Sequence, residues 1–404
     1  MALTSPPAPL GARVPLWLLT LLSFSGTVGM YIFLPALPYA ARALSASASE
    51  VQLTISLYLI GMAAGQLVYG PLSDRFGRQP VLLGGLALYT LAGVATVLAP
   101  GAELLNAARL VQGFGGSSGL VLGRAMARDT APPGDAARRL ALLNLMVSAG
   151  PGLAPVLGAA VAETWGWRAV LVALALLGSV NLLLCGWLLP ETRPLAEAGN
   201  ADWRRLRQHY RALARSRSFL CYALGGGLAT TAVYGLFSSA PFIFVQQLHR
   251  PVHEAGVFLT LLVSGLWFGS VIAVRLLRRH AAHDLLVWAN RVGLLMALVF
   301  LALAVQDRLS LASVAGLMFV YALGVGVAAP TALAKAVNVN PAVVGTASGI
   351  YGFSQMAVGA LCSALVGLGS NPALSAGLLL VLAGLVSQGT FQVAARDAAP
   401  PARR

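Results

Sequence analysis

Long apolar runs recur along the chain at nearly even spacing, and short polar connections separate them. Crossing the roughly 30 Å hydrocarbon core of a bilayer takes about 20 apolar helical residues, because a helix satisfies its own backbone polar groups there. The runs that meet this length are 15–38, 51–71, 80–99, 103–123, 140–161, 168–189, 219–245, 255–275, 284–305, 310–332, 344–367 and 373–394. The pattern therefore predicts an all-α membrane protein with twelve transmembrane helices.

The longest polar stretch lies between the sixth and seventh runs. It predicts a first six-helix bundle over 1–189, a linker over 190–218 and a second six-helix bundle over 219–404. The linker is rich in arginine, and we expect it to lie against anionic lipid headgroups. Binding of nucleic acid or of a regulatory partner is an alternative interpretation of the same residues.

Composition supports the membrane assignment. Only 10% of the residues are charged and 58% are hydrophobic, whereas a soluble domain carries about 25% charged residues. The net charge of +14 does not indicate a nucleic-acid-binding face, because the 27 Lys and Arg lie between the apolar runs. Most of them fall on one side of the membrane, so the positive-inside rule places both termini in the cytoplasm. We expect a multi-pass protein of the bacterial inner membrane.

Three cysteines stand in or beside apolar runs and show no metal-ligand spacing. We expect no metal site and no cofactor. A membrane-embedded enzyme would need polar reactive groups gathered at one depth, and the sequence offers no such group. We therefore expect that the protein is not an enzyme.

The connection after the second run reads GPLSDRFGRQ over 70–79. Gly70 and Gly77 permit close turns between two apolar helices. Asp74, Arg75 and Arg78 are expected to form an ion-pair cluster at the membrane edge.

The fourth run contains an arginine where hydrocarbon is expected. Arg109 lies about 9 Å inside the run, and Gln112 follows one helical turn later. A cation at this depth is costly and usually functional. The alternative is that Arg109 snorkels to the surface or pairs with Glu103.

The fifth run carries glycine and proline near its middle. Gly150, Pro151, Pro155 and Gly158 are expected to weaken this helix so that it bends or slides.

Taken together these motifs identify a resemblance. The chain resembles the major facilitator superfamily, and within it the drug:proton antiporters of the bicyclomycin-resistance type. The resemblance covers nearly the whole chain. The segments that carry it are GPLSDRFGRQ at 70–79, RLVQG at 109–113, RD at 128–129, Pro155 with Gly158, LPALP at 34–38 and GTAS at 345–348.

The resemblance implies a fold and a mechanism. It implies two six-helix bundles that rock around a central site, export of a small organic molecule, exchange for protons, and a monomer in the lipid bilayer without nucleic acid. It places spans 1, 4, 7 and 10 around the cavity. The candidates for substrate binding or coupling are then Tyr31, Arg109, Gln112, Tyr234 and Tyr321.

The resemblance also implies a latch between the halves. Asp74 would face the start of span 11 near Gly345, and Arg75 or Arg78 would pair with Asp129. Gly70 and Gly77 complete this latch.

One departure from the family concerns proton coupling. The family usually has an Asp in span 1 before the LPALP run, and this chain has Tyr31 there in an ungapped alignment or Gly29 after a two-residue insertion. No acidic residue lies near the middle of any span, so the usual carboxylate proton carrier is missing. Alternatives to drug export therefore stay open. They are export of an endogenous metabolite such as a siderophore or an amino-acid derivative, import, or a non-transporting sensor with the same fold.

Overall fold

A computed structural model describes residues 14–131, 135–192, 203–339 and 344–398. The first set of helices is α1 (Leu16–Tyr31), η1 (Leu34–Ala36), α2 (Leu37–Ala43), α3 (Ala48–Phe76), α4 (Arg78–Leu98), α5 (Ala102–Asp129), α6 (Ala136–Trp165) and α7 (Trp167–Leu188). The second set is α8 (Trp203–Arg215), α9 (Arg217–Thr231), α10 (Val233–Phe242), the π-helical turn η3 (Ile243–Gln247), α11 (Val252–Leu276), α12 (Ala282–Val305), α13 (Leu311–Asn338), α14 (Val344–Gly367) and α15 (Pro372–Ala398).

Each predicted span coincides with one of these helices or with a short chain of them. Ten stretches of the described chain are long and apolar enough to cross a membrane. The protein is an all-helical membrane protein, as the apolar pattern predicts.

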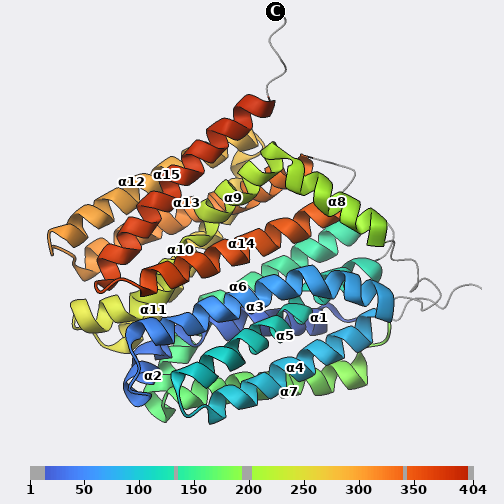
Figure 1. Cartoon of the computed structure of the whole chain (residues 1–404), viewed down its shortest axis with the longest axis horizontal. Coiled ribbons are helices and arrows are strands. Elements are labelled where there is room, and N and C mark those ends of the chain that lie inside the picture. The colour runs from blue at the N-terminus through green and yellow to red at the C-terminus, as the bar shows by residue number, and fades with distance from the viewer. Residues whose placement is uncertain (1–13, 132–134, 193–202, 340–343, 399–404) are drawn as a thin grey trace, which may run out of the picture.

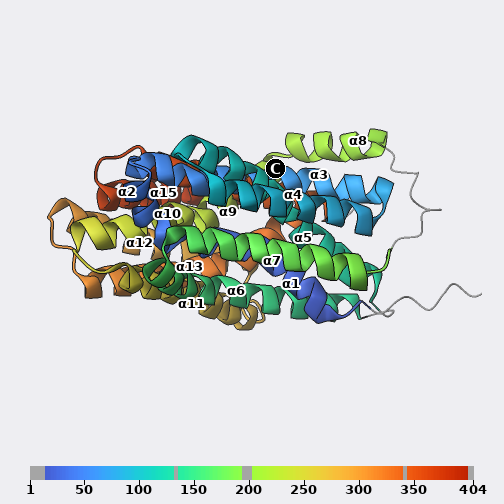
Figure 2. The same cartoon turned by 90° about the horizontal axis from the view of Figure 1, so that it is seen from below.

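The helices of α1–α7 lie together, and those of α9–α15 lie beside them (Figure 1). We call these groups the first and second halves. The arginine-rich end of the molecule is where α3 ends and α4 begins, and the opposite end is where α6 ends and α11 begins. The predicted linker is partly helical, since α8 packs against α9 and α14 and buries Leu213. Helix α8 lies at the edge of the molecule in Figure 2.

Helix α5 is the centre of the first half, where it packs against α1, α3, α4 and α6. Its glycines permit backbone contact with these neighbours. A Cβ atom at Gly113 would overlap the carbonyl oxygen of Tyr58 on α3, and one at Gly119 would overlap that of Leu22 on α1. The close approach expected of a glycine-rich membrane helix is therefore present.

Span 1 is broken, although the apolar run predicts one continuous helix over 15–38. Helix α1 ends at Tyr31, a single 3₁₀ turn follows, and α2 then completes the crossing. Pro35 and Pro38 have no N–H group, so they cannot donate to the carbonyls four residues earlier. The prolines are visible in the sequence, but their effect on the helix was not predicted.

Span 7 is broken as well, against the prediction of one helix over 219–245. Helices α9 and α10 meet at Ala232. The hydroxyl groups of Thr230 and Thr231 donate to the carbonyls of Gly226 and Gly227, which is a contact that often bends helices. Pro241 then precedes the π-helical turn of η3. Spans 1 and 7 hold equivalent places in the two halves, so each half contains one discontinuous helix.

The halves meet along two antiparallel helix pairs, α3 with α14 and α6 with α11. In the first pair, Gln52 lies near Gly367 and Gln66 near Gly352. The broken spans supply further contacts, because η1 touches α10 and α11.

Candidate functional site

An aromatic junction joins the two broken spans. Tyr31, the last residue of α1, meets Phe237 of α10 edge to face, with 5.4 Å between the ring centres. Tyr234, one turn earlier on α10, lies 5.9 Å from Phe237 between ring centres. The structure therefore brings two predicted site residues, Tyr31 and Tyr234, to one place between the halves.

Phe237 is a member of this junction that sequence reasoning missed. It is fully buried, and it stands between the two tyrosines in the chain of ring contacts. Its sequence signal is weak, because an apolar aromatic residue in an apolar span resembles ordinary packing. Only the break between α9 and α10 at Ala232 distinguishes this part of span 7 from an ordinary membrane helix.

Arg109 lies inside the first half and is completely buried. Its Nη2 atom donates to the carbonyl oxygen of Gly29 at 2.8 Å, and its Nη1 atom donates to Oε1 of Gln112 at 2.9 Å. The guanidinium carbon lies 4.2 Å from the ring centre of Tyr58 and 5.4 Å from that of Phe33. The alternatives that Arg109 snorkels or pairs with Glu103 are therefore wrong.

The contact with Gly29 has a clear cause. Because α1 ends two residues later, the carbonyl of Gly29 lies in the last turn, where helical N–H donors run out. A positive charge at the C-terminus of a helix is favourable for the same reason. Arg109 thus stabilises the broken end of span 1 just before Tyr31.

The geometry also distinguishes the two alignments of span 1. A Cβ atom at Gly29 would lie 2.5 Å from the hydroxyl of Tyr58 and 3.1 Å from that of Tyr89. A side chain at position 29 therefore points toward the surroundings of Arg109, whereas Tyr31 points toward the second half. Gly29 is the residue that stands where an acid would face Arg109.

Arg109 keeps unused hydrogen-bonding capacity. Among the described residues its Nε atom has no hydrogen-bond partner, and neither has Nε2 of Gln112. The ion pairs found in the described part of the chain do not include Arg109. Its charge is therefore stabilised by a helix end and by aromatic faces.

Arg78 organises the arginine-rich end. It pairs with Asp74 at 2.8 Å and with Asp129 at 3.0 Å, and it donates to Ser73 at 2.6 Å. Arg75 instead lies over the ring of Phe76. All these residues belong to α3, α4 and α5, so this cluster ties three helices of the first half together. The expected contact of Asp74 with span 11 stays a prediction.

Glu191 is a further member of this cluster that sequence reasoning missed. Its carboxylate accepts from the backbone N–H groups of Arg78 at 3.0 Å and Gln79 at 3.1 Å. Helix α4 has no side-chain cap of its own, since Gly77 precedes it with a positive φ of 93°. Glu191 caps α4 from 113 residues away, and no local sequence pattern predicts such a contact.

The predicted bending residues lie on α6, which runs through all four positions. A Cβ atom at Gly158 would overlap the carbonyl oxygen of Ile32, and the carbonyl of Pro155 lies 3.0 Å from the Cβ position of Gly256 on α11. These two residues therefore lie at close contacts with the broken span 1 and with the second half. Gly70 has open space around its Cβ position. The surroundings of Gly150 and Pro151 lie outside the described side chains, and bending stays a prediction.

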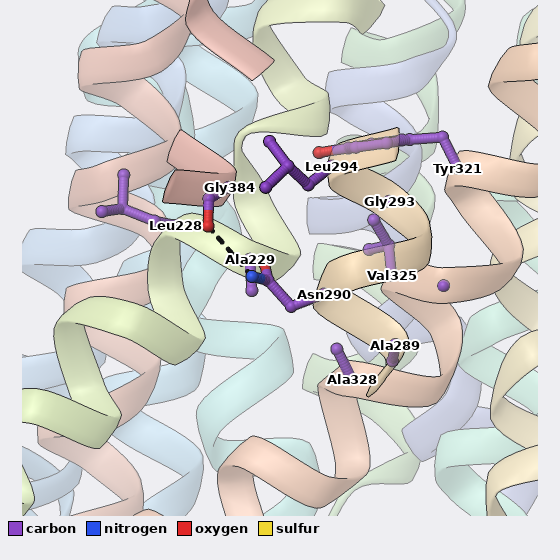
Figure 3. Close-up of a pocket in the computed structure, with 11 residues that line it drawn as sticks. Leu228, Ala229, Ala289, Asn290, Gly293, Leu294, Tyr321, Val325, Ala328 and Gly384 are labelled. Carbon is purple, nitrogen blue, oxygen red and sulfur yellow. Dashed lines mark hydrogen bonds between the residues drawn. The ribbon is translucent and has the colours of Figure 1, made fainter. Parts of the chain in front are cut away.

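Tyr321 does not join the aromatic junction. It lines a small pocket inside the second half, between α9, α12, α13 and α15, together with Asn290 and Gly293 (Figure 3). Asn290 donates there to the carbonyl of Gly384 and to Gln388, each at 2.9 Å. The ring contacts of the junction, among the described residues, do not include Tyr321, and its role in substrate binding stays a prediction.

Comparison with known proteins decides the family. A model of the Major Facilitator Superfamily matches residues 19–363, which is most of the chain. The chain belongs to the major facilitator superfamily. It is therefore a membrane transporter and not an enzyme, and its ligands are small molecules.

Relatives within the family include resistance proteins. The chain is 32% identical over 378 residues to "Multidrug resistance protein D" of Escherichia coli (strain K12), covering 92% of this chain and 93% of the relative. It is 33% identical over 335 residues to "Chloramphenicol resistance protein" of Pseudomonas aeruginosa, covering 80% of this chain and 77% of the relative. A "Bicyclomycin resistance protein homolog" of Haemophilus influenzae is 25% identical over 348 residues, covering 86% of this chain and 87% of the relative, so the resemblance to resistance proteins of this type is confirmed.

Solved structures of the superfamily share the fold. A bacterial homologue of the human lysosomal transporter Spinster, in an inward-facing and unoccupied conformation, superposes with a TM-score of 0.74 at 17% identity, covering 96% of this chain and 98% of that chain. At this identity the likeness concerns the fold alone.

Proposed function

We propose that the protein exports a small organic molecule or drug across the bacterial inner membrane by alternating access, in exchange for protons. The observation that carries the proposal is the junction of the two broken spans at Tyr31 and Phe237. Discontinuous helices that meet between two halves are where transporters of this kind bind their substrates. The names of the two resistance relatives support a drug as the substrate.

The junction suits a planar or amphipathic molecule. Tyr31, Tyr234 and Phe237 present aromatic rings on both sides of the plane between the halves. A ligand ring inserted there would replace the contact between Tyr31 and Phe237 by two contacts of the same kind. Substrate binding would therefore loosen one half from the other without exposing aromatic surface.

Rocking of the halves would expose the junction to each side in turn. The arginine-rich end is placed in the cytoplasm by the positive-inside rule, which also puts both termini there. The cluster around Arg78 connects α3, α4 and α5 with the segment that follows α7.

Proton exchange is the proposed energy source. The candidate carriers are Asp74 and Asp129, which Arg78 holds at the arginine-rich end, and Glu103 in the first turn of α5. Arg109 is assigned a coupling role through span 1, since it holds the helix end that precedes Tyr31.

The test is transport by the purified protein in liposomes with an imposed pH gradient, using chloramphenicol and planar cationic dyes as probes. We expect drug movement that depends on the gradient, accompanied by proton flux in the opposite direction. Drug movement without proton flux would refute the exchange but keep the exporter. If neither occurs, and expression in a drug-sensitive strain gives no resistance, the proposed function is wrong.

A further inference from the structure

A carboxylate of the first half touches the beginning of a helix in the second half. Oε1 of Glu163, near the end of α6, accepts from the backbone N–H of His253 at 2.9 Å. The same oxygen lies 3.3 Å from Nδ1 of the His253 imidazole. Glu163 therefore joins the halves at the opposite end of the molecule, where α6 ends and α11 begins.

Helix α11 has no cap of its own. Pro251 occupies its N-cap position without a side-chain hydrogen bond, and His253 is the second residue of the helix. The first N–H groups of a helix need acceptors, and a carboxylate there also interacts favourably with the helix dipole. Glu163 meets both needs, but it belongs to the other half of the molecule.

This contact depends on how the halves are arranged. Near it, a Cβ atom at Gly256 of α11 would lie only 2.8 Å from Cβ of Ala159 on α6, so the two backbones are in close contact. Separation of α6 from α11 would move the carboxylate of Glu163 away from His253. The first backbone N–H groups of α11 would then be exposed to water.

We propose that Glu163 is a cap for α11 that forms only while the opposite end of the transporter is closed, and that it is a positioning residue for alternating access. This inference rests on the proposed rocking of the halves. Its net effect is to favour the conformation in which the junction at Tyr31 is reached from the arginine-rich end.

Other charged groups lie at the same end of the molecule. Arg250 and Glu254 pair with each other at 3.4 Å at the start of α11. Helix α2 contributes Tyr39 and Arg42, whose guanidinium lies over the Tyr39 ring, and His249 precedes Arg250 in the connecting turn. The Arg250–Glu254 pair lies within the second half, so rocking leaves it intact.

The experiment measures the separation of α6 and α11 directly. Spin labels at Thr164→Cys and Val257→Cys would report the distance in liposomes, in a background with Cys185, Cys221 and Cys362 replaced by alanine and with transport verified. We expect Glu163→Ala to raise the ratio of the long-distance to the short-distance population roughly three- to tenfold. Glu163→Gln should have a smaller effect, because an amide oxygen still accepts a hydrogen bond.

Two variants serve as controls. Glu254→Gln removes an acid from the same turn of α11 without touching the cross-half contact, so its ratio should equal that of the parent protein. His253→Gln keeps the backbone N–H that Glu163 caps, so Glu163→Ala should still raise the ratio in this background.

The outcomes separate this inference from the proposed function. Equal ratios in Glu163→Ala and Glu254→Gln would overturn the cap. If the variants transport drug and all give the same single distance between the labels, the cap is also overturned. Shifted distances in a protein that moves no drug would support the cap and count against drug export.

Discussion

At the scale of residues, Arg109 shows how a charge is kept in the interior of a membrane protein. Its positive charge meets a helix carbonyl at Gly29, an amide oxygen at Gln112 and the aromatic face of Tyr58. Each partner accepts a hydrogen bond or attracts a cation without carrying a formal charge. The arginine thereby binds the end of α1, where span 1 breaks.

The first prediction concerns this arginine. Arg109→Ala leaves the Gly29 carbonyl and the Gln112 oxygen without their donors, and each such buried group costs about 1–3 kcal/mol. We expect transport to fall at least tenfold, while Arg109→Lys keeps the charge and part of the activity. Initial transport rates in liposomes, at equal amounts of folded protein, would check this. Equal rates in all three proteins would refute a role for the charge.

A second prediction concerns the close contact of α5 and α3. Gly113→Ala places a methyl group against the backbone carbonyl of Tyr58. This backbone atom cannot move aside as the end of a flexible side chain can. Overpacking of this kind costs about 1–3 kcal/mol, so the thermal midpoint in detergent should fall by several degrees. Gly84→Ala on α4 has open space at the same atom, and it should not lower the midpoint.

Some residues of the site were predictable and others were not. Arg109 and Gln112 stand out because charged and amide groups are rare inside apolar runs. Glu163 and Glu191 do not stand out, because each lies at the end of a span, where acids are common. Their partners are 90 and 113 residues away, and only the packed helices bring them together.

At the scale of elements, the apolar runs give the helices well but not their breaks. The predicted span 80–99 agrees with α4 to within two residues at each end, because the length of the apolar run is enough to predict this helix. The predicted spans 15–38 and 219–245 hide the breaks at Ile32–Phe33 and Ala232. Such breaks are possible where neighbouring helices satisfy the backbone polar groups that the break releases. A hydropathy profile holds no information about these neighbours.

The third prediction tests the aromatic junction between the broken elements. Tyr31→Ala and Phe237→Ala should each lower the affinity for planar drugs, and the double variant should lose less than the sum, because the two rings contact each other. The coupling free energy should be about 0.5–1.5 kcal/mol. Drug binding by the purified variants would measure it. Tyr321→Ala is the matched control in the second half, and its drug affinity should stay near that of the parent.

At the scale of the whole molecule, the two ends differ in their chemistry. The arginine-rich end is tied together within the first half by Arg78 and Glu191. The opposite end is tied across the halves by Glu163 and His253. A bond between the halves that can open and close fits a molecule that rocks between two arrangements.

The fourth prediction concerns orientation. In intact cells, a membrane-impermeant maleimide should label Arg308→Cys, between α12 and α13, and should not label Arg279→Cys, between α11 and α12. Both side chains are exposed at their ends of the molecule. Inside-out vesicles should give the opposite pattern. Labelling of Arg279→Cys in intact cells would place the arginine-rich end outside and refute the positive-inside assignment.

The glycines and polar groups of α5 also have a consequence for how the protein is made. Helix α5 is described over its whole length, yet it is not among the ten stretches apolar enough to cross a membrane by composition. An arginine at the centre of a span opposes insertion by about 2.5–3.5 kcal/mol, and Arg109 acts in the same direction from nearer the start of α5. During synthesis, this segment should enter the bilayer poorly by itself and efficiently only after α1, α3 and α4 are there to receive its polar face. The buried charge of Arg109 thus makes membrane insertion of α5 depend on the order in which the helices are synthesised.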